Sequence, residues 1–166
     1  MDNLEFLKHR RSVRAFSPKV VPRVELEKII DAARFAPTAR NVQPWQFVAV
    51  TDKQKLSELS AMAENGRFLN QAQACIAVFC EDTKYYLEDG CAATCNILLA
   101  ATALGIGSCW IAGDKKPYCG QVAGLLKAPV GLKLVSLVAL GFPLEENAFK
   151  PAEKNLPGEI THWEKF

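Results

Sequence analysis

The chain has 166 residues, a length that suits one domain burying roughly two thirds of its unfolded surface. It is 49% hydrophobic and 23% charged with a formal net charge of +2, which is typical of a soluble globular protein and argues against nucleic acid as its main partner. The N-terminal stretch MDNLEFLKHRRS lacks the apolar core of a signal peptide, so we expect a cytoplasmic protein.

Hydrophobic periodicity predicts irregularly alternating helices and strands. The pattern begins with a short helix around Leu4 to Leu7, behind an Asp2/Asn3 cap, and continues with an amphipathic helix over 22–35. The remaining predicted helices are 52–64, 86–104 and 120–127, and the predicted strands are 45–51, 74–80, 107–112 and 133–142. Because helices outnumber strands, we expect one α+β domain over 1–166, with a small sheet and helices packed on its faces.

The stretch CNILLAATALGIGSCWIAG carries no charge and approaches the length of a membrane span. Gly105 and Gly107 interrupt it, so the part before Gly105 reads as a buried core helix and we expect no membrane partner. A helix this apolar in so small a chain favours a subunit interface. The segment 143–166 has few apolar residues yet ends in Trp163 and Phe166, which predicts a tail that wraps its own domain or crosses to a second subunit.

Three arginines lie within five positions in HRRSVRAFSP, with a serine between them: Arg10, Arg11, Ser12 and Arg14. Guanidinium groups this close repel one another, so the pattern favours an anion among them. A phosphate suits the planar donor fork of arginine and the serine hydroxyl. A solvated basic turn is the alternative that the cluster alone leaves open.

The stretch PTARNVQPWQF, residues 37–47, is unusually polar for a link between a helix and a strand. Asn41 and Gln43 each offer a donor and an acceptor, which suits the edge of a heterocycle, and Trp45 could wall off an aromatic ring. The alternative is a proline-stiffened turn whose tryptophan fills the core. Further along, in GIGSCWIAG, Gly113 would let a ligand approach main-chain amides.

Six cysteines are present, and Cys91 and Cys95 lie four positions apart on a predicted helix. They could share a metal ion or form a redox pair. No second Cys or His pair with zinc spacing accompanies them, so reduced thiols in apolar surroundings are the favoured interpretation and we expect no metal site.

In this order and spacing, the segments resemble the nitroreductase family of flavin enzymes. The family's opening motif of two basic residues, a serine and a further basic residue is matched by Arg10, Arg11, Ser12 and Arg14. Its P-S-x-x-N-x-Q-P-W loop is matched by Pro37, Thr38, Asn41, Gln43, Pro44 and Trp45. The G-L-G-S-C-W-I element appears as GIGSCWI, and the strand ending in L-G-x-P appears as ALGFP at 139–143.

The resemblance implies a nitroreductase-like α+β fold, with a small mixed or antiparallel central sheet flanked by helices and the long central helix at a homodimer interface. It also implies FMN bound between the subunits, with the basic segment reaching it from one chain and the 37–43 loop from the other. The backbone after Trp110 would face the reactive nitrogen of the flavin. The implied cofactor-binding residues are Arg10, Arg11, Ser12, Arg14, Pro37, Thr38, Ala39, Asn41, Gln43, Ile111, Ala112, Gly113, Lys150 and Lys154.

The function implied is an FMN-dependent oxidoreductase that passes electrons from NADH or NADPH to a nitroaromatic, a quinone or a similar acceptor by a ping-pong mechanism. The flavin carries the chemistry, with Arg14 as electrostatic support and no acid, base or nucleophile from the protein. Two alternatives stay open: a flavin-binding storage or sensor protein without turnover, and a redox or metal protein built on Cys91 and Cys95.

Three features depart from the family pattern. Ala39 stands where many relatives have a second serine, and lysines replace the common lysine-arginine pair near the C-terminus. Only EDTKYYLE joins the strand at 74–80 to the central helix, where larger relatives insert a covering subdomain. Substrate recognition therefore does not follow from the resemblance.

Overall fold

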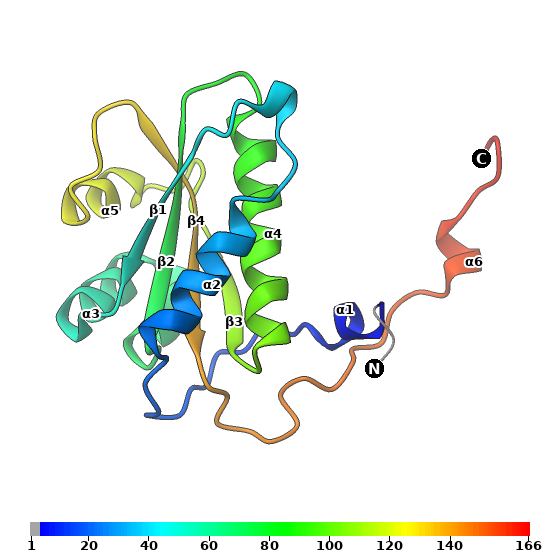
Figure 1. Ribbon diagram of the computed structural model, residues 1–166, viewed down its shortest axis with the longest axis horizontal. Helices are drawn as coiled ribbons and strands as arrows, with labels where there is room; N and C mark the ends of the chain where they lie inside the picture. The colour runs from blue at the N-terminus through cyan, green and yellow to red at the C-terminus, as the bar shows by residue number, and fades with distance from the viewer. Residues whose placement is uncertain (1–3) are drawn as a thin grey trace.

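The computed structural model describes residues 4–166, in which a four-stranded sheet forms the centre of the fold (Figure 1). Its strands are β1 (Trp45–Val50), β2 (Ala74–Glu81), β3 (Gly107–Ala112) and β4 (Leu132–Gly141). They lie in the order β1-β2-β4-β3, and every neighbouring pair is antiparallel. The four predicted strands and the α+β class are confirmed, and the sheet is antiparallel rather than mixed.

The helices follow the predicted pattern to within a few residues. They are α1 (Glu5–His9), α2 (Arg23–Ala33), α3 (Lys53–Met62), α4 (Tyr86–Ala103), α5 (Cys119–Leu125) and α6 (Pro157–Ile160). Two 3-10 helices, η1 (Ala39–Asn41) and η2 (Glu64–Asn70), and the short α6 were not predicted, because so few residues hold no full apolar period. The predicted Asp2/Asn3 cap lies outside the described residues.

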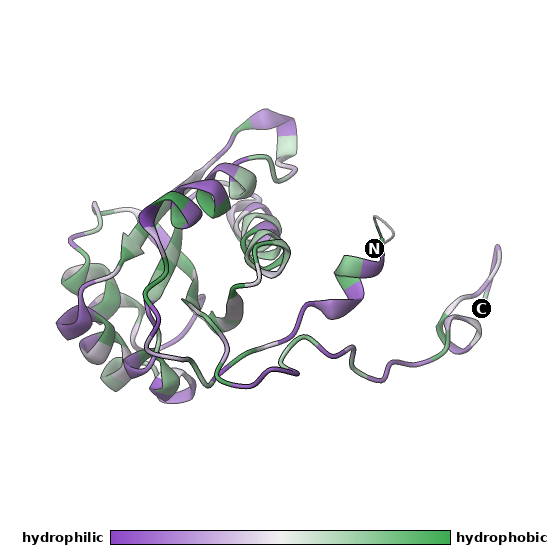
Figure 2. Ribbon diagram, turned by 60° about the horizontal axis from the view of Figure 1, so that its bottom comes forward, coloured by the Kyte–Doolittle hydropathy of each residue, from purple (hydrophilic) through white to green (hydrophobic). Residues whose placement is uncertain are grey.

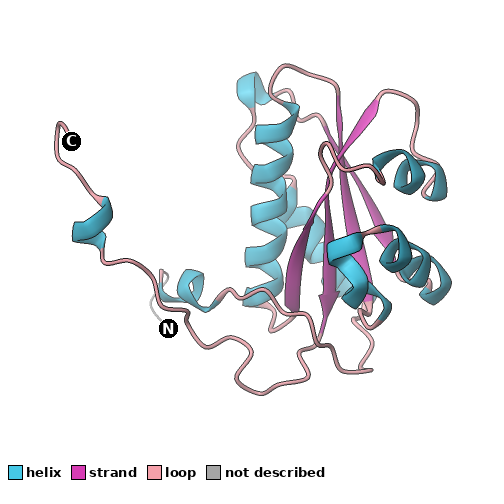
Figure 3. Cartoon of the chain, turned by 180° about the vertical axis from the view of Figure 1, so that it is seen from behind, coloured by secondary structure: helices cyan, strands magenta, loops and turns pink. Residues whose placement is uncertain are grey.

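Helices cover both faces of the sheet, with α2 and α4 on one side and α3, η2 and α5 on the other (Figure 3). Successive side chains of a strand point to opposite faces, so β2 contributes to both layers. Its Ile76, Val78 and Cys80 pack with the α2/α4 layer, and its Cys75, Ala77 and Phe79 pack with the α3/α5 layer. Burial on both faces explains why ACIAVFC is continuously apolar instead of alternating.

The long helix α4 lies close against β4. A Cβ at Gly90 would come within 2.6 Å of Val135, so only glycine allows this approach. Beneath the helix, the hydroxyls of Thr94 and Ser136 form a buried hydrogen bond of 2.8 Å. No helix within residues 4–166 has both the length and the apolar character needed to cross a membrane.

The N-terminal segment meets the outer edge of β3 at residues 12 and 13, and its residues 15–17 pair with residues 142–144 just beyond β4. Ser12 forms a parallel bridge with Ser108, and the Val13 amide donates to the Ser108 carbonyl over 2.9 Å. A Cβ at Gly107 would lie 2.9 Å from the Val13 side chain. The second glycine of GIGS is therefore required where the N-terminal segment meets the sheet.

The C-terminal residues leave the body of the molecule after β4. The tail extends away from the sheet as an extended segment with one short helix, and α1 projects from the same side (Figure 2). The side chains of Leu156, Ile160, Trp163 and Phe166 are all more than 60% exposed. The tail therefore exposes these four large apolar side chains.

Candidate functional site

We define the basic segment as Arg10, Arg11, Ser12 and Arg14. Its arginines form no ion pair with a carboxylate of the described chain, although Glu145 lines a cavity beside them. None of the ion pairs among residues 4–166 includes these arginines. Arg11 Nη1 donates to the Lys150 carbonyl over 2.5 Å, and Arg14 Nη1 makes a long contact of 3.4 Å with the Ser12 carbonyl. Three guanidinium groups are thus left with donors for an external anion.

A cavity of about 290 Å³ lies between residues 11–15 and residues 145–148. The charges of the basic segment act on a buried group, the Cys109 thiol of β3. Burial raises the pKa of the Cys109 thiol, while Arg14, a hydrogen bond from Ser12 and Arg10 act in the opposite direction. Arg10 and Arg14 are therefore close enough to β3 to act on the Cys109 thiol.

The outer end of β3 presents an open main-chain donor. The Gly113 and Asp114 amides both donate to the Val135 carbonyl, over 3.0 and 3.3 Å. Antiparallel pairing alternates, so Ala112, which faces Ser136, turns its own N–H and carbonyl toward the free edge. Of the predicted residues Ile111, Ala112 and Gly113, only Ala112 offers its amide at the free edge of β3. It lies roughly 13 Å along the strand from Ser108.

The carbonyl groups around this donor are held by α5. The Tyr118 hydroxyl donates to the Ala112 carbonyl, and Cys119 Sγ donates to the Gly113 carbonyl over 2.5 Å. Tyr118 is 8% exposed, and burial raises the pKa of its hydroxyl, which keeps it a donor.

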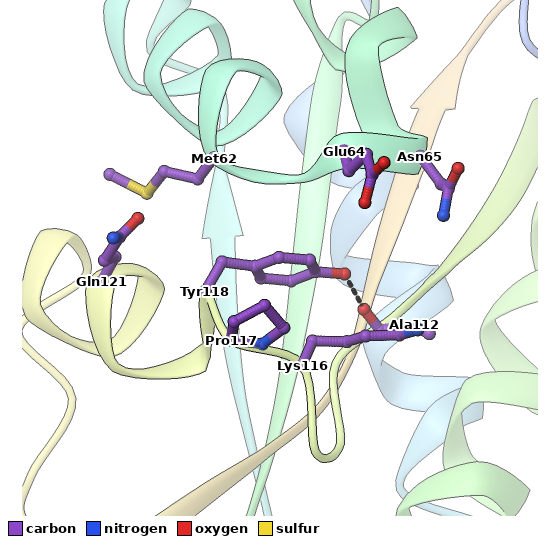
Figure 4. A pocket seen from close by; sticks show the side chains of 8 residues that line it. All are labelled: Met62, Glu64, Asn65, Ala112, Lys116, Pro117, Tyr118 and Gln121. Carbon is purple, nitrogen blue, oxygen red and sulfur yellow. Dashed lines mark hydrogen bonds between the residues drawn. The ribbon is translucent and has the colours of Figure 1, made fainter.

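A second cavity, of about 370 Å³, adjoins Ala112 (Figure 4). Its walls are Met62, Glu64, Asn65, Ala112, Lys116, Pro117, Tyr118 and Gln121. The guanidinium of Arg14 lies 5.9 Å from the ring centre of Phe68, so η2 adjoins both the cavity and the basic segment. η2 was not predicted, because ENGRFLN carries neither a helical nor a strand period.

The 37–43 loop holds unusual backbone angles. Arg40, Asn41 and Gln43 have φ values of 55°, 57° and 53°, in the left-handed region that costs a residue with a side chain roughly 1–2 kcal/mol. The side chains of Asn41 and Gln43 are exposed, and Gln43 Nε2 lies 3.4 Å from the Asn41 carbonyl. Pro37 is also exposed.

The remaining polar groups of the loop are engaged within the same chain. The Thr38 hydroxyl donates to Asp89 Oδ2 over 2.9 Å, and the Ala39 amide donates to Asp89 Oδ1 over 3.2 Å. The Gln43 amide in turn donates to the Thr38 hydroxyl oxygen over 3.2 Å. Asp89 was not among the predicted site residues, although an acid that opens a long apolar helix was a visible signal.

Trp45 does not line an open site. It is 7% exposed and belongs to the core layer between the sheet and helices α2 and α4. Of the two interpretations that the sequence allowed, the structure supports a tryptophan that fills the core.

Two parts of the predicted site lie at opposite ends of α4 (Figure 1). The 37–43 loop is bonded to Asp89 in the first turn, whereas the basic segment meets β3 just beyond the last turn. Eighteen helical residues span about 27 Å. Lys150 lies beside Arg11 through its carbonyl, and Lys154 follows four residues later on the exposed tail. Within one chain, the two parts of the predicted site are therefore separated by about the length of α4.

Cys91 and Cys95 are free thiols on α4. Cys91 is half-buried, burial raises its pKa, and Cys95 is exposed. Within residues 4–166 no three His, Cys, Asp or Glu side chains gather in a way that would hold a metal ion.

An α+β domain with an unbalanced basic segment at one sheet edge and an open amide further along the same strand is suited to a phosphorylated ring ligand. The chain belongs to the nitroreductase family, whose model matches residues 7–83. A relative from Archaeoglobus fulgidus, named "Putative NADH dehydrogenase/NAD(P)H nitroreductase", is 36% identical over 98% of this chain and 98% of its own.

Solved structures show the same fold. An FMN-dependent nitroreductase from Clostridium difficile R20291 is 31% identical, with a TM-score of 0.87 and coverage of 97% of this chain and 98% of that one. A nitroreductase with bound FMN from Bacteroides fragilis is 30% identical, with a TM-score of 0.81 and coverage of 99% and 100%.

Proposed function

We propose that this protein is an FMN-dependent oxidoreductase that takes electrons from NADH or NADPH and reduces a nitroaromatic, a quinone or a similar small acceptor. The observation that carries the proposal is the basic segment: three arginines without carboxylate partners beside a cavity, on the strand edge that also exposes the Ala112 amide. The names of its relatives, which include NAD(P)H nitroreductase and FMN-dependent nitroreductase, support the same class.

The residues present fit FMN. The donors of Arg10, Arg11 and Ser12 suit its phosphate, with Lys150 or Lys154 closing from the tail. Arg14, which extends toward η2, suits the pyrimidine edge of the ring, and the Ala112 amide offers a donor to the ring itself. FMN, when bound, supplies the two-electron chemistry, so the protein supplies position and charge.

We further propose a homodimer in which each site uses two chains. The separation of the 37–43 loop from the basic segment along α4 supports it, because a ligand that uses both would have to lie between two chains. The outward face of α4 carries the uncharged side chains of Cys91, Cys95 and Leu99, which a second copy can cover. In this arrangement residues 1–166 form one domain, whose 143–166 tail crosses to the partner subunit with its exposed Trp163 and Phe166.

A ping-pong order fits the short connection between β2 and α4. The Thr83 amide closes a tight turn on the Glu81 carbonyl over 2.7 Å, and no covering subdomain occupies this position in the described chain. One open face then serves both the nicotinamide donor and the acceptor, in turn. Steady-state rates with both substrates varied should give parallel double-reciprocal lines.

Two measurements test the proposed function. The purified protein should show a yellow, flavin-like absorption spectrum, and it should oxidise NADH or NADPH when a quinone is added. A colourless protein that takes up no FMN would remove the proposal.

The open site also leaves a second candidate, a flavin-binding storage or sensor protein. That function predicts the same spectrum, but no nicotinamide oxidation either in air or with added quinone.

A further inference from the structure

We propose that Asp89 is a positioning residue that presets the 37–43 loop of one chain for the FMN held by its partner. The inference rests on the proposed function, because it concerns the same flavin site. The loop's backbone lies in the left-handed region at Arg40, Asn41 and Gln43, an arrangement that persists only where surrounding contacts impose it.

Packing does not impose this conformation. Residues 40–43 are exposed, and Val42 shows half of its side chain to solvent. A cavity of about 160 Å³ separates the loop from residues 83–85, so little apolar contact supports it from below. The residues that flank it, Ala36, Pro44 and Trp45, are buried.

Asp89 supplies the missing constraint. Its carboxylate is 5% exposed and accepts two hydrogen bonds from the loop, from the Thr38 hydroxyl and from the Ala39 amide. Thr38 passes the constraint on, since its oxygen accepts the Gln43 amide at the far side of the left-handed residues. One carboxylate thus fixes both ends of the turn.

The environment keeps Asp89 suited to this task. It lies in the first turn of α4, where the helix dipole favours a negative charge. No lysine or arginine among residues 4–166 forms an ion pair with it, so its partners are hydrogen-bond donors of the loop and no cation competes with them. Hydrogen bonds to a buried charge are the strong ones, and an exposed turn held by them is ordered before a ligand arrives.

The test measures FMN affinity of the dimeric protein by flavin fluorescence, first for the unmodified chain. Asp89→Asn removes the negative charge and leaves one acceptor oxygen in place of two, so the Thr38 hydroxyl and the Ala39 amide can no longer both donate to it. We expect it to weaken FMN about ten- to a hundredfold. Glu88→Gln, an exposed acid in the same turn, is the matched control and should leave affinity unchanged.

Thr38 distinguishes positioning from a general loss of stability. Thr38→Val keeps the shape, removes the hydroxyl and should weaken FMN as Asp89→Asn does, whereas Thr38→Ser should restore affinity close to that of the unmodified chain. The double variant Thr38→Val/Asp89→Asn should bind FMN no more weakly than the weaker-binding of the two single variants, because both substitutions break the same set of hydrogen bonds.

The outcomes separate the two proposals. An unmodified chain that binds no FMN contradicts the proposed function. An unmodified chain that binds FMN, with Asp89→Asn and Thr38→Val within about twofold of it, overturns the role of Asp89 alone. Equal losses in Thr38→Ser and Thr38→Val would also overturn it, because the hydroxyl would then not matter.

Discussion

The basic segment and the 37–43 loop look alike in the sequence, as two short polar stretches that resemble flavin-binding motifs, but the structure separates them. The arginines of the basic segment form no ion pair within the described chain, and each keeps donors for an external anion beyond the bonds that Arg11 and Arg14 make to main-chain carbonyls. The Thr38 hydroxyl and Ala39 amide of the loop are bonded to Asp89. One region is suited to act by charge and the other by shape, so resemblance to a binding motif does not say which groups meet the ligand.

The largest effect should come from separating the two regions, which the proposed dimer brings together. Cys95→Arg would place a charge on the outward face of α4, and a buried unpaired charge is strongly destabilising at an interface. We expect monomers that have lost FMN affinity by more than about a hundredfold. Sedimentation measures the oligomeric state and flavin content measures the loss of FMN, with Cys95→Ala as the control variant. A yellow dimer of the Arg variant would contradict the shared site.

The charge of the basic segment gives the next effect. Arg10→Ala removes charge-assisted hydrogen bonds worth about 1.5–3 kcal/mol each, which should weaken FMN about ten- to a hundredfold. The loss should be smaller at high salt, where screening already reduces the contribution of the charge. Affinity that is unaltered at every salt concentration would show that the segment is a solvated turn.

Within the basic segment, Arg14 should differ from the others. A cation at the pyrimidine edge stabilises the reduced ring, so in Arg14→Ala saturated with FMN the reduction potential should fall by a few tens of millivolts. About 30 mV corresponds to 1.4 kcal/mol for two electrons. Lys154→Ala should change affinity without moving the potential. If Arg14→Ala leaves both the potential and the rate of reduction by NADH unchanged, Arg14 is a phosphate ligand only.

The shape of the loop can be tested at Arg40, whose left-handed backbone suits glycine. Arg40→Gly relieves a strain of roughly 1–2 kcal/mol but adds chain entropy of about 0.5–1 kcal/mol, so stability should rise by about 1 kcal/mol or less. FMN affinity should stay within about twofold, although a positive charge is lost. Denaturant titration and fluorescence measure the two quantities. A tenfold loss of affinity would mean that this loop also acts by charge.

The smallest effect concerns the end of β3 near Ala112. Like the 37–43 loop, it is hydrogen-bonded to the first turn of α4. Tyr86 donates to Asp114 Oδ1 over 2.6 Å, and this bond raises the pKa of Tyr86 to about 12. A raised pKa contributes stability below the unfolded value near 10, and that contribution is lost as pH rises toward 12. Between pH 10 and 12 the free energy of unfolding should therefore fall less steeply with pH in Tyr86→Phe than in the unmodified chain. Identical slopes in the two proteins would count against the bond.

The sequence by itself determined the elements and the charge. Apolar runs predicted the four strands and a period of 3.6 predicted the main helices, and the run at 74–80 is continuously apolar because its strand is buried on both faces. These features are local, because side-chain direction repeats within a few residues. The arginine cluster is local for the same reason.

Only the tertiary structure decided which polar groups are free. Thr38 meets Asp89, 51 residues away, and the pairing of β3 with β4 turns the Ala112 amide outward while it occupies that of Gly113. Trp45 was assigned to the core in the same way, by helices α2 and α4 that pack over it. A hydrogen-bonding group is available to a ligand only when no group of the folded chain has taken it, and the partners that take it come from distant parts of the sequence.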